Sequence, residues 1–99
     1  METGERNAVE SENKLGLVRG EIVKSDRAAL EVLVKRFGLS KDAAKLKRVL
    51  GMDIEDPGRE IQLKLIHEEI AIELGLSVIF VRKLFDLIIE ESKRIQTEG

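Results

Sequence analysis

The chain has 99 residues, 36% of them charged, with 17 basic and 19 acidic side chains and a net charge of −2. This length predicts one domain, and the near balance of charge excludes a generic nucleic-acid binder, though not a local basic pocket. The absence of cysteine excludes disulfides and thiolate chemistry. No apolar run approaches the roughly 18–20 residues of a membrane span, and METGERNAVESENK does not resemble a signal peptide. We therefore expect a cytoplasmic protein that binds neither membrane nor nucleic acid.

Residues 1–14 are polar and without periodicity, so we expect a flexible N-terminal tail there and a helical domain over residues 15–97. Apolar residues at steps of three and four then predict one long helix over Leu17–Leu50. The stripe consists of Ile22, Ala29, Val32 or Leu33, Arg36, Ser40, Ala43, Lys47 and Leu50.

Two members of this stripe are cations, where a core would have aliphatic residues. Arg36 and Lys47 are eleven residues apart, so they share a helix face at about 16 Å. The two side chains could close on a small anion between them. The alternative is that the inward-facing stripe has been assigned one position away from its true place, in which case the two cations do not form a binding site.

The weak point of the long helix is Gly38, because an interior glycine costs about 1 kcal/mol relative to alanine. A second interpretation ends one helix at Gly38 and begins another at Ser40, as in a helix-turn-helix. The stripe keeps its phase across Gly38, which favours the single helix.

Two shorter helices follow. Asp56 and Pro57 are typical of an N-cap and first helical position, and predict a helix over Pro57–Leu74 that ends at Gly75. Ser77 predicts the cap of a third helix, about Val78 to Gln96. Its expected inward residues are Val81, Leu84, Phe85, Ile88, Ile89 and Ile95. No segment alternates like a strand, so we expect an all-α fold of three helices, one long and two shorter. The long helix leaves an apolar stripe that a second copy of the chain would cover.

Polar residues also interrupt the shorter helices. Ser92 and Gln96 continue the inward line of the third helix, although residues so near a C-terminus are usually at the surface. Arg59 and Glu60 open the second helix, where charges usually form a solvated first turn. His67, the one histidine, is expected to be exposed and to have no role.

Together these positions resemble the all-helical class of chorismate mutases, of the monofunctional, homodimeric type, from about Leu15 to Gln96. The resemblance is strongest in EDPGRE (residues 55–60) and in GLSVIFVRKLFDLIIEESKRIQ (residues 75–96). The family's ligand-contacting pattern is matched by Arg19, Arg36, Lys47, Asp56, Arg59, Glu60, Ser92 and Gln96.

The resemblance implies the rearrangement of chorismate, a small dianion, to prephenate in aromatic amino-acid biosynthesis. This intramolecular bond shift needs no cofactor or metal, but conformer restraint and charge stabilisation at the breaking ether bond. By resemblance, Arg36 and a partner's Arg19 grip the two carboxylates, which a guanidinium pairs with bidentately. The catalytic set is then Lys47, Gln96, Arg36 and Arg19.

The remaining positions are implied to bind substrate. Lys47 and Gln96 would donate to the ether oxygen, and Ser92 would assist at a carboxylate. Glu60 and the backbone at Asp56 would hold the ring hydroxyl, while Arg59 orders its acidic neighbours.

Arg19 precedes Arg36 by seventeen positions, about 25 Å along the helix and roughly 100° around it. One chain could hardly bring both to one small ligand without a sharp break. An intertwined two-fold homodimer, which the family forms, would solve this by supplying Arg19 from the partner chain.

Two other functions remain open from the sequence. The same scaffold supports a pyruvate lyase acting on isochorismate. A non-enzymatic helical module, for dimerisation or for DNA binding through residues 38–50, is the more distant alternative.

Overall fold

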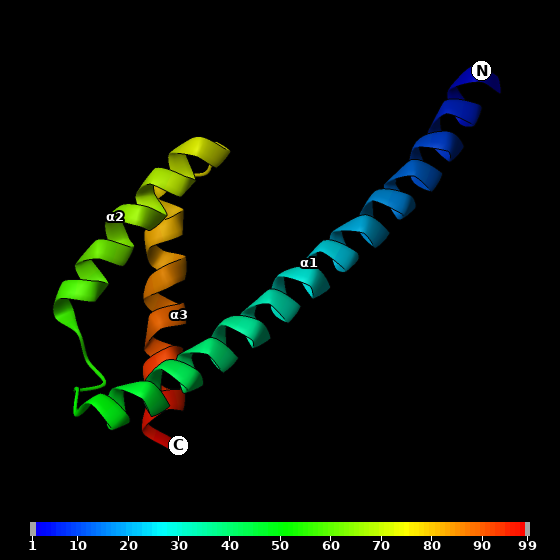
Figure 1. Ribbon diagram of the computed structural model, residues 1–99. Coiled ribbons are helices and arrows are strands. Elements are labelled where there is room, and N and C mark those ends of the chain that lie inside the picture. Colours follow the sequence, from blue (N-terminus) through cyan, green and yellow to red (C-terminus); the bar gives the residue numbers. More distant parts are fainter. Residues whose placement is uncertain (1, 99) are drawn as a thin grey trace. The chain divides into compact units, whose positions relative to one another are not determined.

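The protein is described by a computed structural model covering residues 2–98, with side chains from Gly4 onward. Three helices follow one another: α1 (Glu2–Leu50), α2 (Pro57–Leu74) and α3 (Val78–Glu98) (Figure 1). Residues 2–98 contain no strand, which confirms the predicted all-α class. In the same part of the chain, no helix is both long and apolar enough to cross a membrane.

The chain divides into two units inside α1, at the boundary between Arg36 and Phe37. We call residues 1–36 the N-terminal arm. Residues 37–99, which contain the end of α1 together with α2 and α3, are called the helical domain. Each unit is described by itself.

The N-terminal arm is helical from Glu2, whereas the polar composition of residues 1–14 predicts a flexible tail. That expectation missed the helix because it rested on hydrophobic periodicity alone. The segment ETGERNAVESENK contains no proline and several good helix formers, which favour a helix without tertiary packing. The domain boundary at residue 15 stays a prediction.

The apolar residues of the arm are exposed. Val18 is 53%, Ile22 54% and Val32 65% accessible, although their spacing places them on one helix face. Two ion pairs at helical spacing lie along the same helix, Glu21–Lys24 at 3.3 Å and Arg27–Glu31 at 2.9 Å. Val23 and Val34 are exposed on another side of the helix, at 66% and 73%. The arm therefore exposes apolar side chains on more than one side.

Helix α1 continues through Gly38 and ends at Leu50. The helix-turn-helix interpretation is therefore wrong. Gly51 adopts a left-handed φ of 68°, and the next amide, that of Met52, donates to the Lys47 carbonyl at 2.8 Å. Gly51 therefore ends the helix and Gly38 does not, because Gly51 adopts the left-handed conformation that closes a helix and Gly38 remains helical.

The ends of α2 are as the sequence predicts. Asp56 accepts the Arg59 amide at 3.1 Å through its Oδ1, and Pro57 takes the first helical position. Gly75 adopts a φ of 70°, and the Leu76 amide donates to the Ala71 carbonyl at 2.8 Å. These local bonds satisfy backbone groups that a helix end would leave unpaired.

Helices α2 and α3 form an antiparallel pair (Figure 1). The Ser77 hydroxyl accepts the Phe80 amide at 3.2 Å and begins α3 after a three-residue turn. Such a short connection makes the two helices antiparallel neighbours. We call this pair the hairpin.

The core of the helical domain is thin. Its buried aliphatic residues are Ala44, Ala71, Val81 and Ile88. Several large aliphatic residues are exposed, among them Ile61, Leu65 and Ile72 of α2 and also Leu84 of α3, which was expected to point inward. Monomeric soluble proteins rarely expose large apolar areas of this kind.

Candidate functional site

The eight predicted site residues are divided between the two units. Arg19 and Arg36 belong to the N-terminal arm. The helical domain contains the other six: Lys47, Asp56, Arg59, Glu60, Ser92 and Gln96.

Ser92 and Gln96 are buried on the inner face of α3. They continue the line of Val81 and Ile88, and Gln96 is only 9% exposed. The usual expectation that polar residues near a C-terminus lie at the surface is therefore wrong for both. The Ser92 hydroxyl donates to the Ile88 carbonyl at 2.9 Å.

The Gln96 side chain is incompletely satisfied. Its Oε1 is buried and has no hydrogen-bond partner among the described residues. A buried polar atom left this way costs about 1–3 kcal/mol, and the carbonyl and amino ends of a glutamine can exchange places. The side chain therefore offers a donor or an acceptor to a group that the chain alone does not provide.

Two basic residues of α1 lie in its last turn, close to the end of α3. Lys47 is half-buried on the same face as Ala43 and the buried Ala44. At this end of α1 the predicted stripe therefore lies on the inner face of the helix, and its position was not misread by one residue. The Lys47 ammonium donates to the Ile54 carbonyl at 2.8 Å. Arg48 donates through Nη2 to the Gln96 carbonyl at 3.3 Å, which ties the end of α1 to the end of α3. An ammonium carries three donors, so Lys47 has capacity for a ligand besides Ile54.

The first turn of α2 presents the acidic and basic residues predicted there. Asp56 caps the helix, as described above, and is partly buried. Arg59 is exposed, and its Nη1 lies 3.5 Å from the Gln62 Oε1. Glu60 is half-buried, which distinguishes it from the solvated first turn that is common in helices.

Glu60 is paired with a residue that the sequence pattern did not single out. The Lys93 Nζ lies 2.7 Å from Glu60 Oε1 and 3.5 Å from Glu55 Oε1. The hydrogen bond to Glu60, opposed in part by desolvation, raises the pKa of Lys93. Lys93 follows Ser92 directly, so it is turned about 100° from Ser92 around α3.

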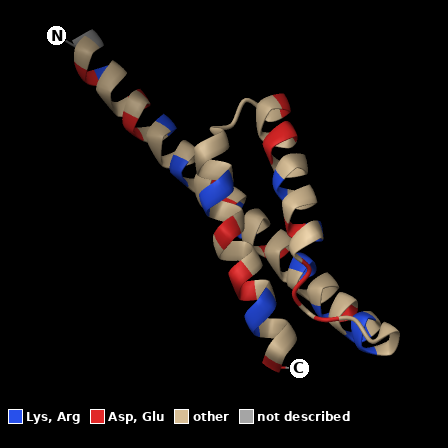
Figure 2. Ribbon diagram, turned by 90° about the vertical axis from the view of Figure 1, so that its left-hand side faces the viewer, with Lys and Arg blue, Asp and Glu red and all other residues tan. Residues whose placement is uncertain are grey.

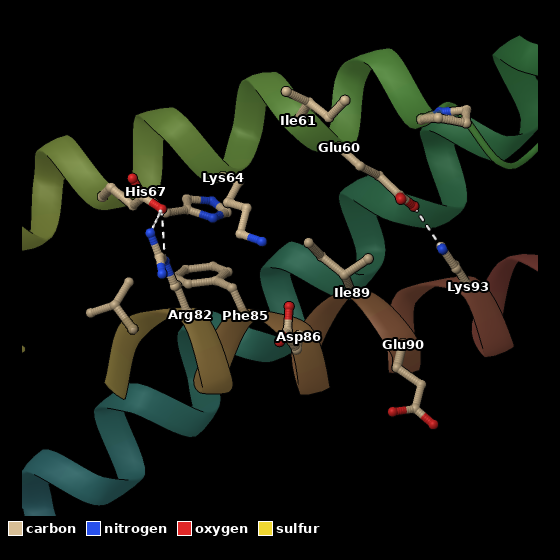
Figure 3. Close-up of a pocket in the computed structure, with 13 residues that line it drawn as sticks. Glu60, Ile61, Lys64, His67, Arg82, Phe85, Asp86, Ile89, Glu90 and Lys93 are labelled. Carbon is tan, nitrogen blue, oxygen red and sulfur yellow. Dashed lines mark hydrogen bonds and ion pairs between the residues drawn. The ribbon is translucent and has the colours of Figure 1, made fainter. Parts of the chain in front are cut away.

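Lys93 and Glu60 line one end of a groove between α2 and α3, which encloses about 450 Å³ (Figure 3). Towards the other end, Arg82 and Glu68 form an ion pair at 2.7 Å. His67 stacks on Phe85 with ring centroids 3.7 Å apart. His67 is thus half-buried, contrary to its expected exposure. Neither Ser92 nor Gln96 lines the groove.

The two predicted site arginines of the arm differ from each other. Arg19 is exposed, whereas Arg36 is half-buried, and desolvation lowers the pKa of its guanidinium. An arginine remains charged under such a shift. Of these two site arginines, only Arg36 lies on the apolar stripe.

Basic and acidic residues are interspersed along the helices and do not form a surface of one sign (Figure 2). Within residues 2–98, no three histidine, aspartate or glutamate side chains are grouped so that they could hold a metal ion. The buried polar side chains of the helical domain are instead an amide and a hydroxyl, and Lys47 in the last turn of α1 is half-buried. This combination suits an uncharged or anionic ligand that accepts hydrogen bonds.

Comparison with known proteins gives one consistent result. Residues 18–97 match the family model described as chorismate mutase type II. The chain is 31% identical over 89 residues to a chorismate mutase of Methanocaldococcus jannaschii, and the match covers 86% of each protein. No solved structure gives a significant match.

Proposed function

The chain belongs to the chorismate mutase type II family, and we propose that it converts chorismate to prephenate with the eight residues predicted from its sequence. The enzyme is an isomerase. Its substrate is a small dianion, and the reaction breaks a carbon–oxygen ether bond while a carbon–carbon bond forms within the same molecule. No group is transferred to the protein, so the site must restrain a reactive conformer and stabilise charge on the ether oxygen.

The observation that carries the assignment within the helical domain is the buried Gln96 side chain. Its Oε1 has no hydrogen-bond partner among the described residues, and the backbone carbonyl of Gln96 accepts from Arg48, which follows Lys47 in the last turn of α1. In our proposal Gln96 and Lys47 donate to the ether oxygen, where negative charge develops. A donor in a water-poor site stabilises such charge far better than water does. With the two ends of the amide exchanged, its NH2 group would take the position of the unpaired oxygen and could donate to the ether oxygen.

The carboxylates of the substrate require permanent cations. We assign the two carboxylates to Arg36 and to Arg19 of a partner chain. The hydroxyl of Ser92 would assist at one carboxylate. A guanidinium can bind a carboxylate through two parallel hydrogen bonds. The fixed charges of Arg19 and Arg36 make this assignment insensitive to pH across the neutral range.

The ring hydroxyl of the substrate requires an acceptor. The Glu60 carboxylate, together with the backbone at Asp56, is our candidate, because both lie in the first turn of α2. Arg59 is assigned a role in ordering this acidic turn. Its exposure and its contact with Gln62 are compatible with closure over a ligand.

A homodimer is part of the proposal. The arm exposes Val18, Ile22 and Val32 on one face, and an apolar face of this length is stable in water only when covered. A second copy of the chain would cover it and would bring Arg19 to the partner's site. The product would serve aromatic amino-acid biosynthesis.

The direct test is to incubate the purified protein with chorismate and to measure prephenate, with isochorismate assayed side by side. We expect prephenate from chorismate and little pyruvate from isochorismate. Lys47→Ala should lower turnover by about a hundredfold or more while circular dichroism remains unchanged. Pyruvate as the main product would replace the mutase assignment with the lyase, and a fully active Lys47→Ala variant would remove Lys47 from the site.

A further inference from the structure

Lys93 differs from most cations of the chain in what it connects. The ion pairs of Lys24, Arg27 and Arg94 lie within one helix, at spacings of three or four residues. Lys93 instead joins three segments, because it extends from the end of α3 to Glu60 in α2 and Glu55 in the preceding connector. Its side chain is 36% exposed, so part of its hydrocarbon stem is buried in the groove.

The partner of Lys93 is a residue of the proposed site. Lys93 contacts Glu60 through Oε1 at 2.7 Å, and Figure 3 shows the two side chains pointing toward each other. An ionised carboxylate has two oxygens and several acceptor positions. One oxygen of Glu60 is thus held by the ammonium, while the other keeps its capacity to accept a hydrogen bond.

The charge of Lys93 matters as much as its geometry. Glu55, Asp56 and Glu60 place three carboxylates near the start of α2, where they would repel a dianionic ligand. A protonated lysine between two of them offsets this repulsion. The raised pKa of Lys93 keeps it protonated throughout the neutral range.

We propose that Lys93 is a positioning residue that acts through Glu60. It fixes the orientation of the Glu60 carboxylate for the ring hydroxyl of the substrate and neutralises the acidic turn so that a dianion can approach. Lys93 itself does not contact the substrate. This inference rests on the proposed function, because it requires that Glu60 accept a substrate hydroxyl.

The role predicts a defined kinetic pattern. Lys93→Met keeps the length and apolar stem of the side chain but removes its charge, and should raise KM about tenfold, as expected for a partly exposed charged hydrogen bond. The value of kcat should change about threefold or less, because Glu60 binds a part of the substrate that does not react. Lys93→Arg should restore KM to within about twofold, since a guanidinium can also donate to Glu60.

A double-mutant cycle separates action through Glu60 from direct contact with substrate. We expect Glu60→Gln to raise KM by itself, and the added Lys93→Met to cause no further rise. Lys83→Met serves as the matched control, because Lys83 lies on the same helix, is exposed and forms no ion pair among the described residues. It should leave KM and kcat unchanged.

The outcomes distinguish the alternatives. If Lys93→Met raised KM equally in the parent protein and in the Glu60→Gln variant, Lys93 would contact the substrate itself. An unchanged KM with a lower unfolding midpoint would mean that Lys93 only stabilises the fold. Either result in an active enzyme overturns the positioning role and leaves the mutase assignment standing. A parent protein that does not convert chorismate overturns the proposed function, and this inference with it.

Discussion

The N-terminal arm and the hairpin are both helical, but they are stabilised differently. In the arm, the ion pairs join residues of the same helix, and the apolar side chains remain exposed. In the hairpin, contacts such as Arg82–Glu68 and His67–Phe85 join two helices. The hairpin therefore contains its own tertiary contacts, whereas the ion pairs described for the arm are local to one helix. The predicted site residues follow this division, because those of the arm are all cations and those of the helical domain include the amide, the hydroxyl and the carboxylates.

The strongest test of this contrast asks whether the arm serves another chain. Arg19→Ala and Lys47→Ala homodimers should each lose about a hundredfold or more of activity, because every site lacks one cation. When they are mixed and exchange chains, about half the dimers become mixed, and one site in each has neither lesion. Roughly a quarter of the parent's activity should then return.

Exchange must be verified, for instance by mass spectrometry after tagging one variant. No recovery despite confirmed exchange would show that Arg19 does not serve the partner's site. Arg19 would then be a surface charge and not part of the catalytic machinery.

A second test addresses the helical domain alone. Gln96→Glu replaces the amide with a group that donates only when protonated, so the variant should be active at low pH and lose activity as pH rises through the pKa of the new carboxyl group. At neutral pH the loss should be on the order of a hundredfold. A pH–rate profile matching the parent's would place Gln96 away from the reacting bond.

The role of the apolar stripe of the arm in the proposed dimer can be tested by introducing a charge. Ile22→Glu places a charge in the proposed dimer interface, twice per dimer, and should shift the protein to monomers with loss of activity. Sedimentation velocity would measure the change. Val23→Glu is the matched control, because Val23 is similarly exposed but turned about 100° away from the stripe. Monomers from the control variant alone would mean that the stripe was assigned to the wrong face.

The smallest effect is expected in the hairpin. Arg82→Ala removes a cross-helix ion pair whose arginine is 49% exposed. Exposed pairs contribute little, so the free energy of unfolding should fall by about 0.5 kcal/mol. Urea titration would measure this change, and a decrease of several kcal/mol would show that the pair is central to the hairpin.

Local signals in the sequence predicted the helix ends well. Asp56, Pro57 and Gly75 act within one turn of the residues they satisfy, so their effect is independent of the rest of the fold. The inward phase of Ser92 and Gln96 was likewise readable from their spacing. The structure shows that Ser92 and Gln96 are buried, while the contacts assigned to them with substrate stay predictions.

Contacts between helices were not predicted, because helical periodicity says nothing about which residues of two helices meet. Lys93 and the stacking of His67 were missed for this reason. A signal was present, however: His67 and Phe85 are each nine residues from Leu76, while Glu60 and Lys93 are sixteen and seventeen residues away. Residues equally far from the turn of an antiparallel pair lie at the same height.

The same symmetry has a consequence for sequence length. An insertion of one residue between Gly75 and Ser77 that the turn did not absorb would shift every partner on α3 by about 1.5 Å along its axis and rotate it by about 100°. The connector between α1 and α2 does not set a register of this kind, because Gly51 ends α1 and Asp56 begins α2 independently of each other. Homologous chains should therefore vary in length in the connector and keep the turn at three residues.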